Sequence, residues 1–167
     1  MAEFLSAEGP HEWPKLTFAG VMSFGRAPYS RALEGVDIAI LGVPFDLATT
    51  GRSGAREGPN AVRVESAKLS ELENFPHGFD PIKERRIVDC GDATVVPTDI
   101  HRTAAAIRTV ARTIATGAVP LMLGGDHYVM FPTYQGVTDA HPGKVVGIVQ
   151  IDAHNDLIDD DAVLGRH

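Results

Sequence analysis

The sequence is poor in cysteine and has no excess of positive charge. Cys90 is the only cysteine, so an intrachain disulfide is impossible. We expect Cys90 to be a small buried residue and the protein to be at home in the reducing cytoplasm. Lysine and arginine number 15 against 22 aspartate and glutamate residues, which gives a formal net charge of −7. Such a chain lacks the basic surface that a phosphate backbone requires, so we expect no nucleic-acid partner. A small cationic ligand suits this sign of charge better.

Long apolar runs are also missing. No stretch approaches the roughly 20 apolar residues that cross a membrane, so we expect no membrane partner. Residues 1–10 lack the basic and apolar regions of a signal peptide. The chain has 167 residues, of which 44% are hydrophobic and 22% charged, as in an ordinary globular domain. We expect residues 36–167 to belong to one domain, preceded by an irregular arm over residues 1–35 that lies on the core or on a neighbouring subunit.

Strand and helix patterns alternate from residue 36 onward. The continuous apolar run 36–43 is typical of a strand buried on both faces, and Pro44 ends it. Three further strands are predicted, at 86–89, 119–123 and 145–151. Three helices are predicted, from Pro59 to about Leu72, from Thr98 or Asp99 to Gly117, and from 128 to 138. This alternation implies right-handed crossovers and a three-layer α/β fold, an open parallel sheet with helices on both faces.

The strongest chemical signal follows the last predicted strand, where Asp152, His154 and Asp156 occupy alternate positions. Ligands of open α/β sheets bind beyond the carboxyl ends of the strands, so this segment lies at the expected mouth. An extended chain would point the three side chains the same way, and their oxygen and nitrogen donors suit a divalent metal ion. The alternative is a polar cap in which the same side chains only satisfy backbone groups.

A second signal lies at the end of the strand 119–123. Gly124 and Gly125 permit a tight turn that can bring His127 to the same mouth, while Asp126 could fix a ligand's orientation through a hydrogen bond. The alternative is a glycine turn with Asp126 as a helix cap and an exposed histidine. Two separate clusters of acid and imidazole at two strand ends favour the metal site.

Together these motifs resemble those of the ureohydrolases, the arginase/agmatinase family. The segments 124–127 and 152–156 resemble the first two metal signatures of the family, in the same order. The loop through 42–46 and 52–63 resembles the agmatinase branch, and the segment 88–92 resembles the short family strand that ends in Gly-Asp. The resemblance implies an arginase-like fold that is incomplete at its C-terminus.

The resemblance further implies a binuclear metal site. His127, Asp152 and Asp156 would bind one ion, while Asp152 and His154 would bind the other, with Asp152 as the bridge and with Asp152 and His154 as the catalytic residues. The implied cofactor is two Mn²⁺ per active site, and Ni²⁺ is the alternative ion. The implied reaction is metal-dependent hydrolysis of the guanidino group of a cationic substrate such as agmatine to urea and an amine, in a homotrimer or homohexamer.

The chain also departs from the family pattern. Two later aspartates of an Asp-x-Asp motif complete both metal shells in the family, and that motif lies beyond His167. Asn155 and Tyr128 replace small hydroxyl residues, which leaves the substrate open. Two alternatives therefore stand beside agmatine hydrolysis. One is a catalytically incomplete fragment or assembly subunit, and the other is a relative that acts on another guanidino or formimino compound.

Overall fold

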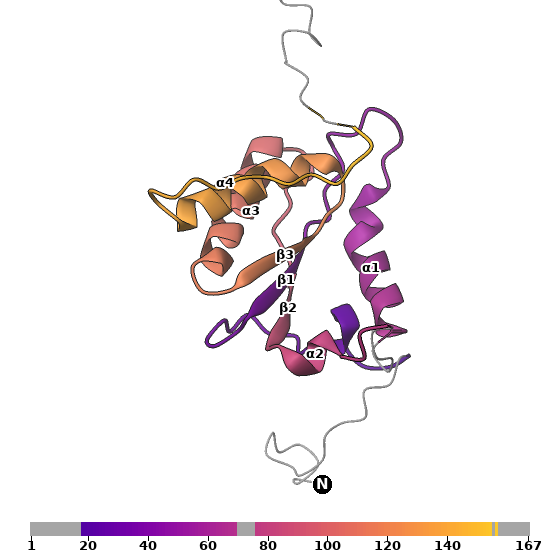
Figure 1. Ribbon diagram of the computed structural model, residues 1–167. Helices are drawn as coiled ribbons and strands as arrows, with labels where there is room; N and C mark the ends of the chain where they lie inside the picture. Colours follow the sequence, from indigo (N-terminus) through magenta and orange to yellow (C-terminus); the bar gives the residue numbers. More distant parts are fainter. Residues whose placement is uncertain (1–17, 70–75, 155, 157–167) are drawn as a thin grey trace, which may run out of the picture.

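A computed structural model of the chain describes residues 18–69, 76–154 and 156. Its centre is a parallel three-stranded sheet in the order β2-β1-β3 (Figure 1). The strands are β1 (Ile38–Gly42), β2 (Ile87–Asp92) and β3 (Val119–Leu123). Ile38 of β1 pairs with Ile87 on one side and with Val119 on the other. The predicted strands at 36–43, 86–89 and 119–123 are confirmed.

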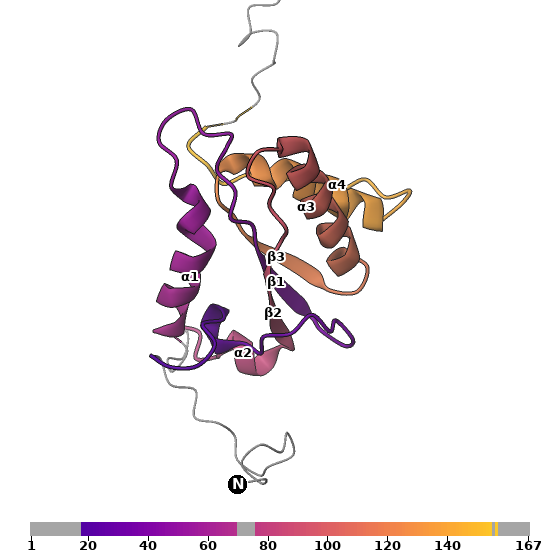
Figure 2. The same cartoon turned by 180° about the vertical axis from the view of Figure 1, so that it is seen from behind.

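Helices cover both faces of this sheet. One face is covered by α1 (Gly58–Ala67), and the opposite face by α3 (Ile100–Ala115) and α4 (Met130–Ala140), which lie side by side (Figures 1 and 2). The shorter elements are η2 (Phe24–Arg26), η3 (Ala55–Glu57), α2 (Pro81–Glu84) and η4 (His127–Val129). The structure thus confirms the predicted three-layer α/β class.

The central strand is buried on both faces. Leu41 and Val43 pack with Ile107 and Ile114 of α3, whereas Ile40 points the other way and packs near Ile87 and Ile82. Successive side chains of a strand point to opposite faces, so a strand covered on both sides needs an unbroken apolar run. That is the pattern from which β1 was predicted.

Local chemistry sets the helix ends. Asp99 caps α3 as predicted, since its Oδ1 accepts a hydrogen bond from the Arg102 amide at 2.9 Å. Pro59 stands in the first turn of α1, also as predicted. The helix ends at Ala67 and is followed by a turn at residues 68–69, so it is shorter than predicted, and residues 70–72 of that prediction lie outside the described residues.

A buried ion-pair network joins α1 to β2. The Arg63 guanidinium donates to both carboxylate oxygens of Asp89, at 2.8 and 2.9 Å, and to Asp92 and the Gly91 carbonyl, at 2.7 and 2.8 Å. Arg63 is 7% exposed and Asp89 is fully buried. Arg63 therefore stabilises the packing of α1 against the sheet.

The described part of the arm lies along the outer edge of β2. Tyr29 forms a parallel bridge with Asp89, and the Arg31 Nε donates to the Cys90 carbonyl at 3.3 Å. Cys90 is buried as expected, and burial raises the pKa of its thiol. The arm prediction for residues 1–17 lies outside the described residues, and the division of the chain at residue 36 stays a prediction.

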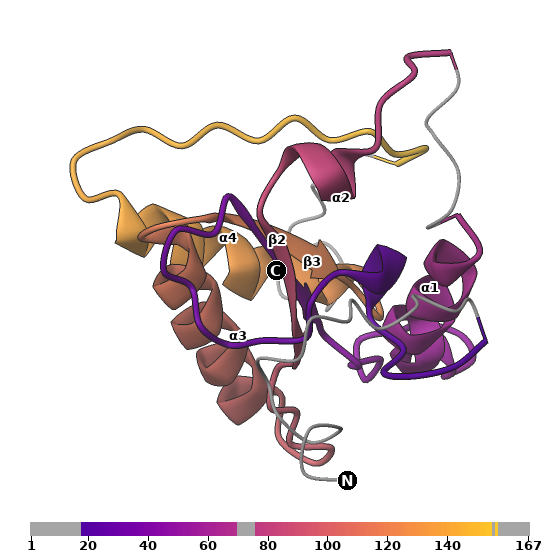
Figure 3. The ribbon, with the colours of Figure 1, turned by 90° about the horizontal axis from the view of Figure 1, so that it is seen from below.

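The predicted strand 145–151 is wrong. This segment runs extended past α4 and pairs with no strand among the described residues (Figure 3). Val145 is 100% exposed, Val149 92% and Ile151 98%, and the nearest support is a 3.1 Å hydrogen bond from the Tyr134 hydroxyl to the Val146 carbonyl. β-Branched residues favour a strand only where a neighbouring strand supplies backbone partners and a packed face, and no strand of the described residues pairs with this segment.

Candidate metal site

A tight glycine turn carries the first predicted ligand from the end of β3. The Asp126 amide donates to the Phe45 carbonyl at 2.8 Å. A Cβ atom added at Gly125 would lie 2.0 Å from that same carbonyl oxygen. Only glycine fits this contact, so Gly125 fixes where His127 leaves the sheet.

Asp126 is a buried cap. It is 8% exposed, its Oδ1 accepts from the Tyr128 amide at 3.1 Å, and its Oδ2 accepts from the Ala48 amide at 2.8 Å. Asp126 therefore forms the helix cap, and its second carboxylate oxygen also bonds the loop at Ala48. The side chain of His127, the next residue, is 47% exposed and turns toward the second motif.

Three of the four predicted metal ligands come together. His127 Nε2 lies 3.2 Å from Asp156 Oδ2, and His127 Nδ1 lies 4.0 Å from Asp152 Oδ2. One ligand atom from each of the three residues lies within 4.8 Å of the others. Strand alternation does not produce this convergence, because residues 152–154 form a bend and Asp156 has a left-handed φ of 50°.

The fourth predicted ligand, His154, stands apart from this group. Its side chain is 82% exposed, and its Nδ1 lies 3.9 Å from Asp152 Oδ1. The backbone amide of His154 donates to Asp152 Oδ1 at 3.0 Å, and this hydrogen bond is the main cause of the lowered pKa of Asp152. Asn155 and His167 lie outside the described residues.

The three converging residues open onto a hollow of about 510 Å³. Its lining is His127, Met130, Ile148, Gln150, Asp152, Ala153, His154 and Asp156. Two carboxylates and two imidazoles therefore face the same space as the apolar side chains of Met130 and Ile148. Sequence reasoning missed those two apolar residues, because the contact between α4 and the segment 145–151 has no local sequence signal.

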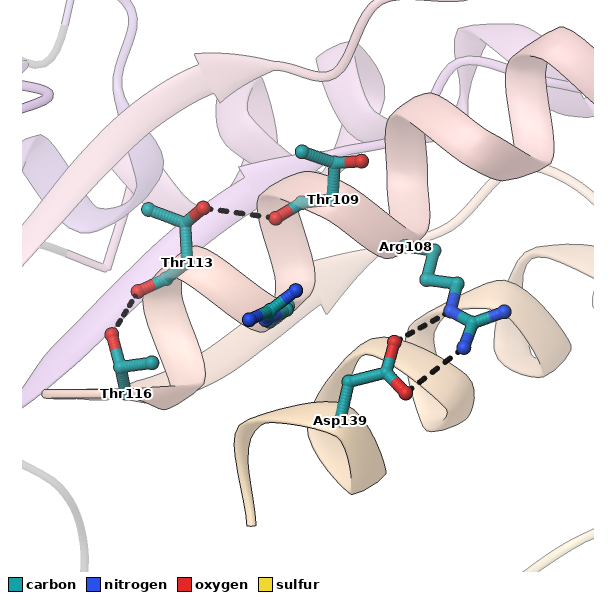
Figure 4. Close-up of a pocket in the computed structure, with 6 residues that line it drawn as sticks. Arg108, Thr109, Thr113, Thr116 and Asp139 are labelled. Carbon is teal, nitrogen blue, oxygen red and sulfur yellow. Dashed lines mark hydrogen bonds and ion pairs between the residues drawn. The ribbon is translucent and has the colours of Figure 1, made fainter. Parts of the chain in front are cut away.

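A second hollow, of about 580 Å³, lies between α3 and α4 (Figure 4). Arg108 binds Asp139 through two hydrogen bonds of 2.6 and 2.9 Å, which hold the pKa of Asp139 below its usual value. The threonines beside them donate their hydroxyl protons to backbone carbonyls, as Thr113 does to Thr109 at 2.9 Å. These groups bind one another, so the hollow is a weaker candidate site than the cluster around His127.

Comparison with known proteins identifies the family. The model of the arginase family matches residues 36–165. The chain belongs to the arginase family. The matched region covers most of the chain and contains the positions of the four predicted ligands.

Three relatives illustrate the range of this arginase-family similarity. An agmatinase of Chromobacterium violaceum is 46% identical over 155 residues, which are 87% of this chain and 45% of that protein. The crystal structure of a hypothetical agmatinase from Burkholderia thailandensis has a TM-score of 0.71 and 46% identity over 74% of this chain and 40% of that one. A formiminoglutamase of Trypanosoma cruzi, crystallised with Mn²⁺, has a TM-score of 0.59 and 27% identity over 68% of this chain and 39% of that one.

The chain thus spans less than half the length of these relatives. The match confirms the arginase-like fold. It also means that the relatives contain a large segment with no counterpart in this sequence.

Proposed function

We propose that this chain provides metal ligands to a ureohydrolase that hydrolyses the guanidino group of a small cationic substrate, such as agmatine, to urea and an amine. The observation that carries the proposal is the convergence of His127, Asp152 and Asp156 within 4.8 Å. The 46% identity to an agmatinase supports agmatine as the first substrate to test.

The donor set fits a divalent metal ion. Each donor of one ion lies roughly 2.0–2.2 Å from it, so two donors cannot be more than about 4.4 Å apart. The separations of 3.2 and 4.0 Å involve different nitrogens of His127. With one ligand atom from each residue, the three atoms lie within 4.8 Å of one another, so the side chains would draw slightly closer around one ion. We propose that His127, Asp152 and Asp156 hold one ion and that Asp152 and His154 hold a second. Carboxylate and imidazole ligands suit Mn²⁺, and Ni²⁺ remains the alternative.

The residues of the site have separable roles in this proposal. Bound divalent ions supply Lewis acidity, which lowers the pKa of water and stabilises negative charge in the transition state. The carboxylates of Asp152 and Asp156 would hold the ions and offset part of their positive charge. Met130 and Ile148 offer an apolar wall of the same hollow, which suits the methylene chain of an alkylguanidine.

An assembly-dependent site is the main alternative. The chain spans 45% of the matched agmatinase, so further ligands can come from a segment that this sequence does not contain. The position of His154 outside the three-residue cluster favours this alternative, because a second ion would have few ligands here. Action on a formimino compound is a further alternative, consistent with the similarity to a formiminoglutamase.

The test combines metal content with urea release. Purified protein is dialysed against Mn²⁺, its metal content is measured by elemental analysis, and urea release is assayed with agmatine. We expect bound Mn²⁺ and a fall of at least about tenfold in affinity in Asp152→Asn, because the bridging charge is lost. Asp99→Asn, at the cap of α3, is the matched control and should bind normally.

The outcomes separate the alternatives. Unchanged Mn²⁺ binding in Asp152→Asn would contradict the ligand assignment. Bound Mn²⁺ without urea would favour the assembly-dependent site, and release of another product would favour a different substrate.

We also propose a cytoplasmic homotrimer or homohexamer. In the described part of the chain no helix is long and apolar enough to cross a membrane.

A further inference from the structure

The turn that carries His127 is tied to a loop far away in the sequence. This loop, residues 45–57, leaves β1 and returns to α1. The Asp126 amide donates to the Phe45 carbonyl, and Asp126 Oδ2 accepts from the Ala48 amide, both at 2.8 Å. The rings of Phe45 and Tyr128 also pack with centroids 5.9 Å apart. The loop and the turn therefore meet through backbone, carboxylate and ring contacts.

The loop is also closed on itself. Asp46 is 2% exposed, and its carboxylate accepts from the Gly54 amide at 2.7 Å and from the Arg56 amide and Nε at 3.2 and 2.8 Å. Its start and end are therefore held together independently of Asp126. The hydrogen bond from the Ala48 amide to Asp126 therefore connects the His127 turn to a loop that is already closed.

We propose that Asp126 is a positioning residue, whose two carboxylate oxygens join the 45–57 loop to the helical turn that begins with His127. One oxygen caps the Tyr128 amide and the other holds the Ala48 amide. His127 is the residue between Asp126 and the capped Tyr128, and its imidazole projects from this position. The position of His127 relative to Asp152 and Asp156 therefore depends on the loop, although no loop residue lines their hollow.

The role requires both carboxylate oxygens. A serine can still cap the Tyr128 amide, because serine is a good N-cap residue, but its single short hydroxyl cannot also hold Ala48. Asp126→Ser therefore removes the carboxylate bond to Ala48 and keeps the cap, while the backbone bond to Phe45 and the ring contact remain. The part of the proposal that concerns metal affinity rests on the proposed function, whereas the part that concerns the loop does not.

The experiment measures the loop and the metal separately in wild type, Asp126→Ser and the control Asp99→Ser. Asp99 caps α3 with the same chemistry and has no contact with the loop in the described residues. Hydrogen exchange of residues 45–54 reports on the link. We expect Asp126→Ser to exchange about 2- to 10-fold faster there, as for the loss of one hydrogen bond. Calorimetry with Mn²⁺ should show roughly 10- to 100-fold weaker binding, as for other residues that orient a ligand.

Each outcome of this experiment supports one conclusion about Asp126 or about the proposed function. Unchanged exchange of the loop in Asp126→Ser would overturn the link itself. Faster exchange with wild-type Mn²⁺ affinity would overturn the positioning role toward His127. An equal loss of Mn²⁺ affinity in Asp99→Ser would reveal general destabilisation and would also overturn that role. Wild-type protein that binds no Mn²⁺ would contradict the proposed function, while the exchange data would still decide whether Asp126 links loop and turn.

Discussion

Replacement of Arg63 by methionine tests how much the buried network between α1 and β2 contributes to stability. Methionine keeps the length and much of the apolar stem of arginine but removes all four guanidinium hydrogen bonds to β2. Asp89 would then be a fully buried carboxylate without its cation.

The magnitude follows from what remains around Asp89. Removing one partner of a buried pair costs about 3 to 5 kcal/mol. Asp89 keeps hydrogen bonds from the Phe24 and Gly91 amides, at 2.8 and 2.9 Å, so we expect a value near the lower limit, about 3 kcal/mol. With a urea m-value of about 2 kcal/mol/M, the unfolding midpoint should fall by about 1.5 M.

Urea unfolding followed by circular dichroism checks this value. Arg86→Met is the matched control, because Arg86 is 73% exposed and its nitrogen lies 4.0 Å from Asp37, a pair worth less than about 1 kcal/mol. The double variant Arg63→Met/Asp89→Asn should lose less than the sum of the two single losses, since no unpaired charge is left. A loss below about 1 kcal/mol in Arg63→Met, or strict additivity, would refute the reasoning.

Two further predictions concern the turn and the α3–α4 contact. Gly125→Ala should destabilise the protein by at least about 2 kcal/mol in thermal unfolding, because its Cβ would lie 2.0 Å from the Phe45 carbonyl oxygen; an unchanged Tm would contradict the close approach. Asp139→Asn should lower the urea midpoint slightly near pH 7, and this difference should disappear in strong acid, well below the ordinary carboxyl pKa. The hydrogen bond from Arg108 lowers the pKa of Asp139 in the folded state, so the stabilisation exists above the ordinary pKa and is lost when Asp139 is protonated. Urea midpoints that differ equally at both pH values would exclude this pair as the cause.

Much of the fold could be predicted because its causes are local. The unbroken apolar run of β1 has one explanation, burial on both faces, and the cap at Asp99 needs only its own helix. The segment 145–151 has the same composition as a buried strand, yet its apolar side chains are exposed. Strand formation depends on a neighbouring strand, which composition does not describe.

In the metal site, too, some features could be predicted from the sequence and others depend on distant parts of the chain. The sequence indicated that His127, Asp152 and Asp156 belong together by placing them at two strand ends. The three residues do converge, although the second of those strands does not form. It could not indicate that the convergence depends on a bend and a left-handed Asp156, or that His154 lies outside the three-residue cluster. The bond from Ala48 to Asp126 joins residues 78 positions apart, so no local pattern could reveal it.

The order of the strands has a consequence for the chain as it is synthesised. β1 is made first, but its neighbours β2 and β3 begin only at Ile87 and Val119. At a synthesis rate of roughly 5 to 20 residues per second, several seconds pass between the synthesis of β1 and that of its second neighbour, β3. During that time Leu41, Val43 and Phe45 have no α3 to cover them. We therefore expect the nascent chain to depend on chaperone binding to this run until residue 123 has left the ribosome.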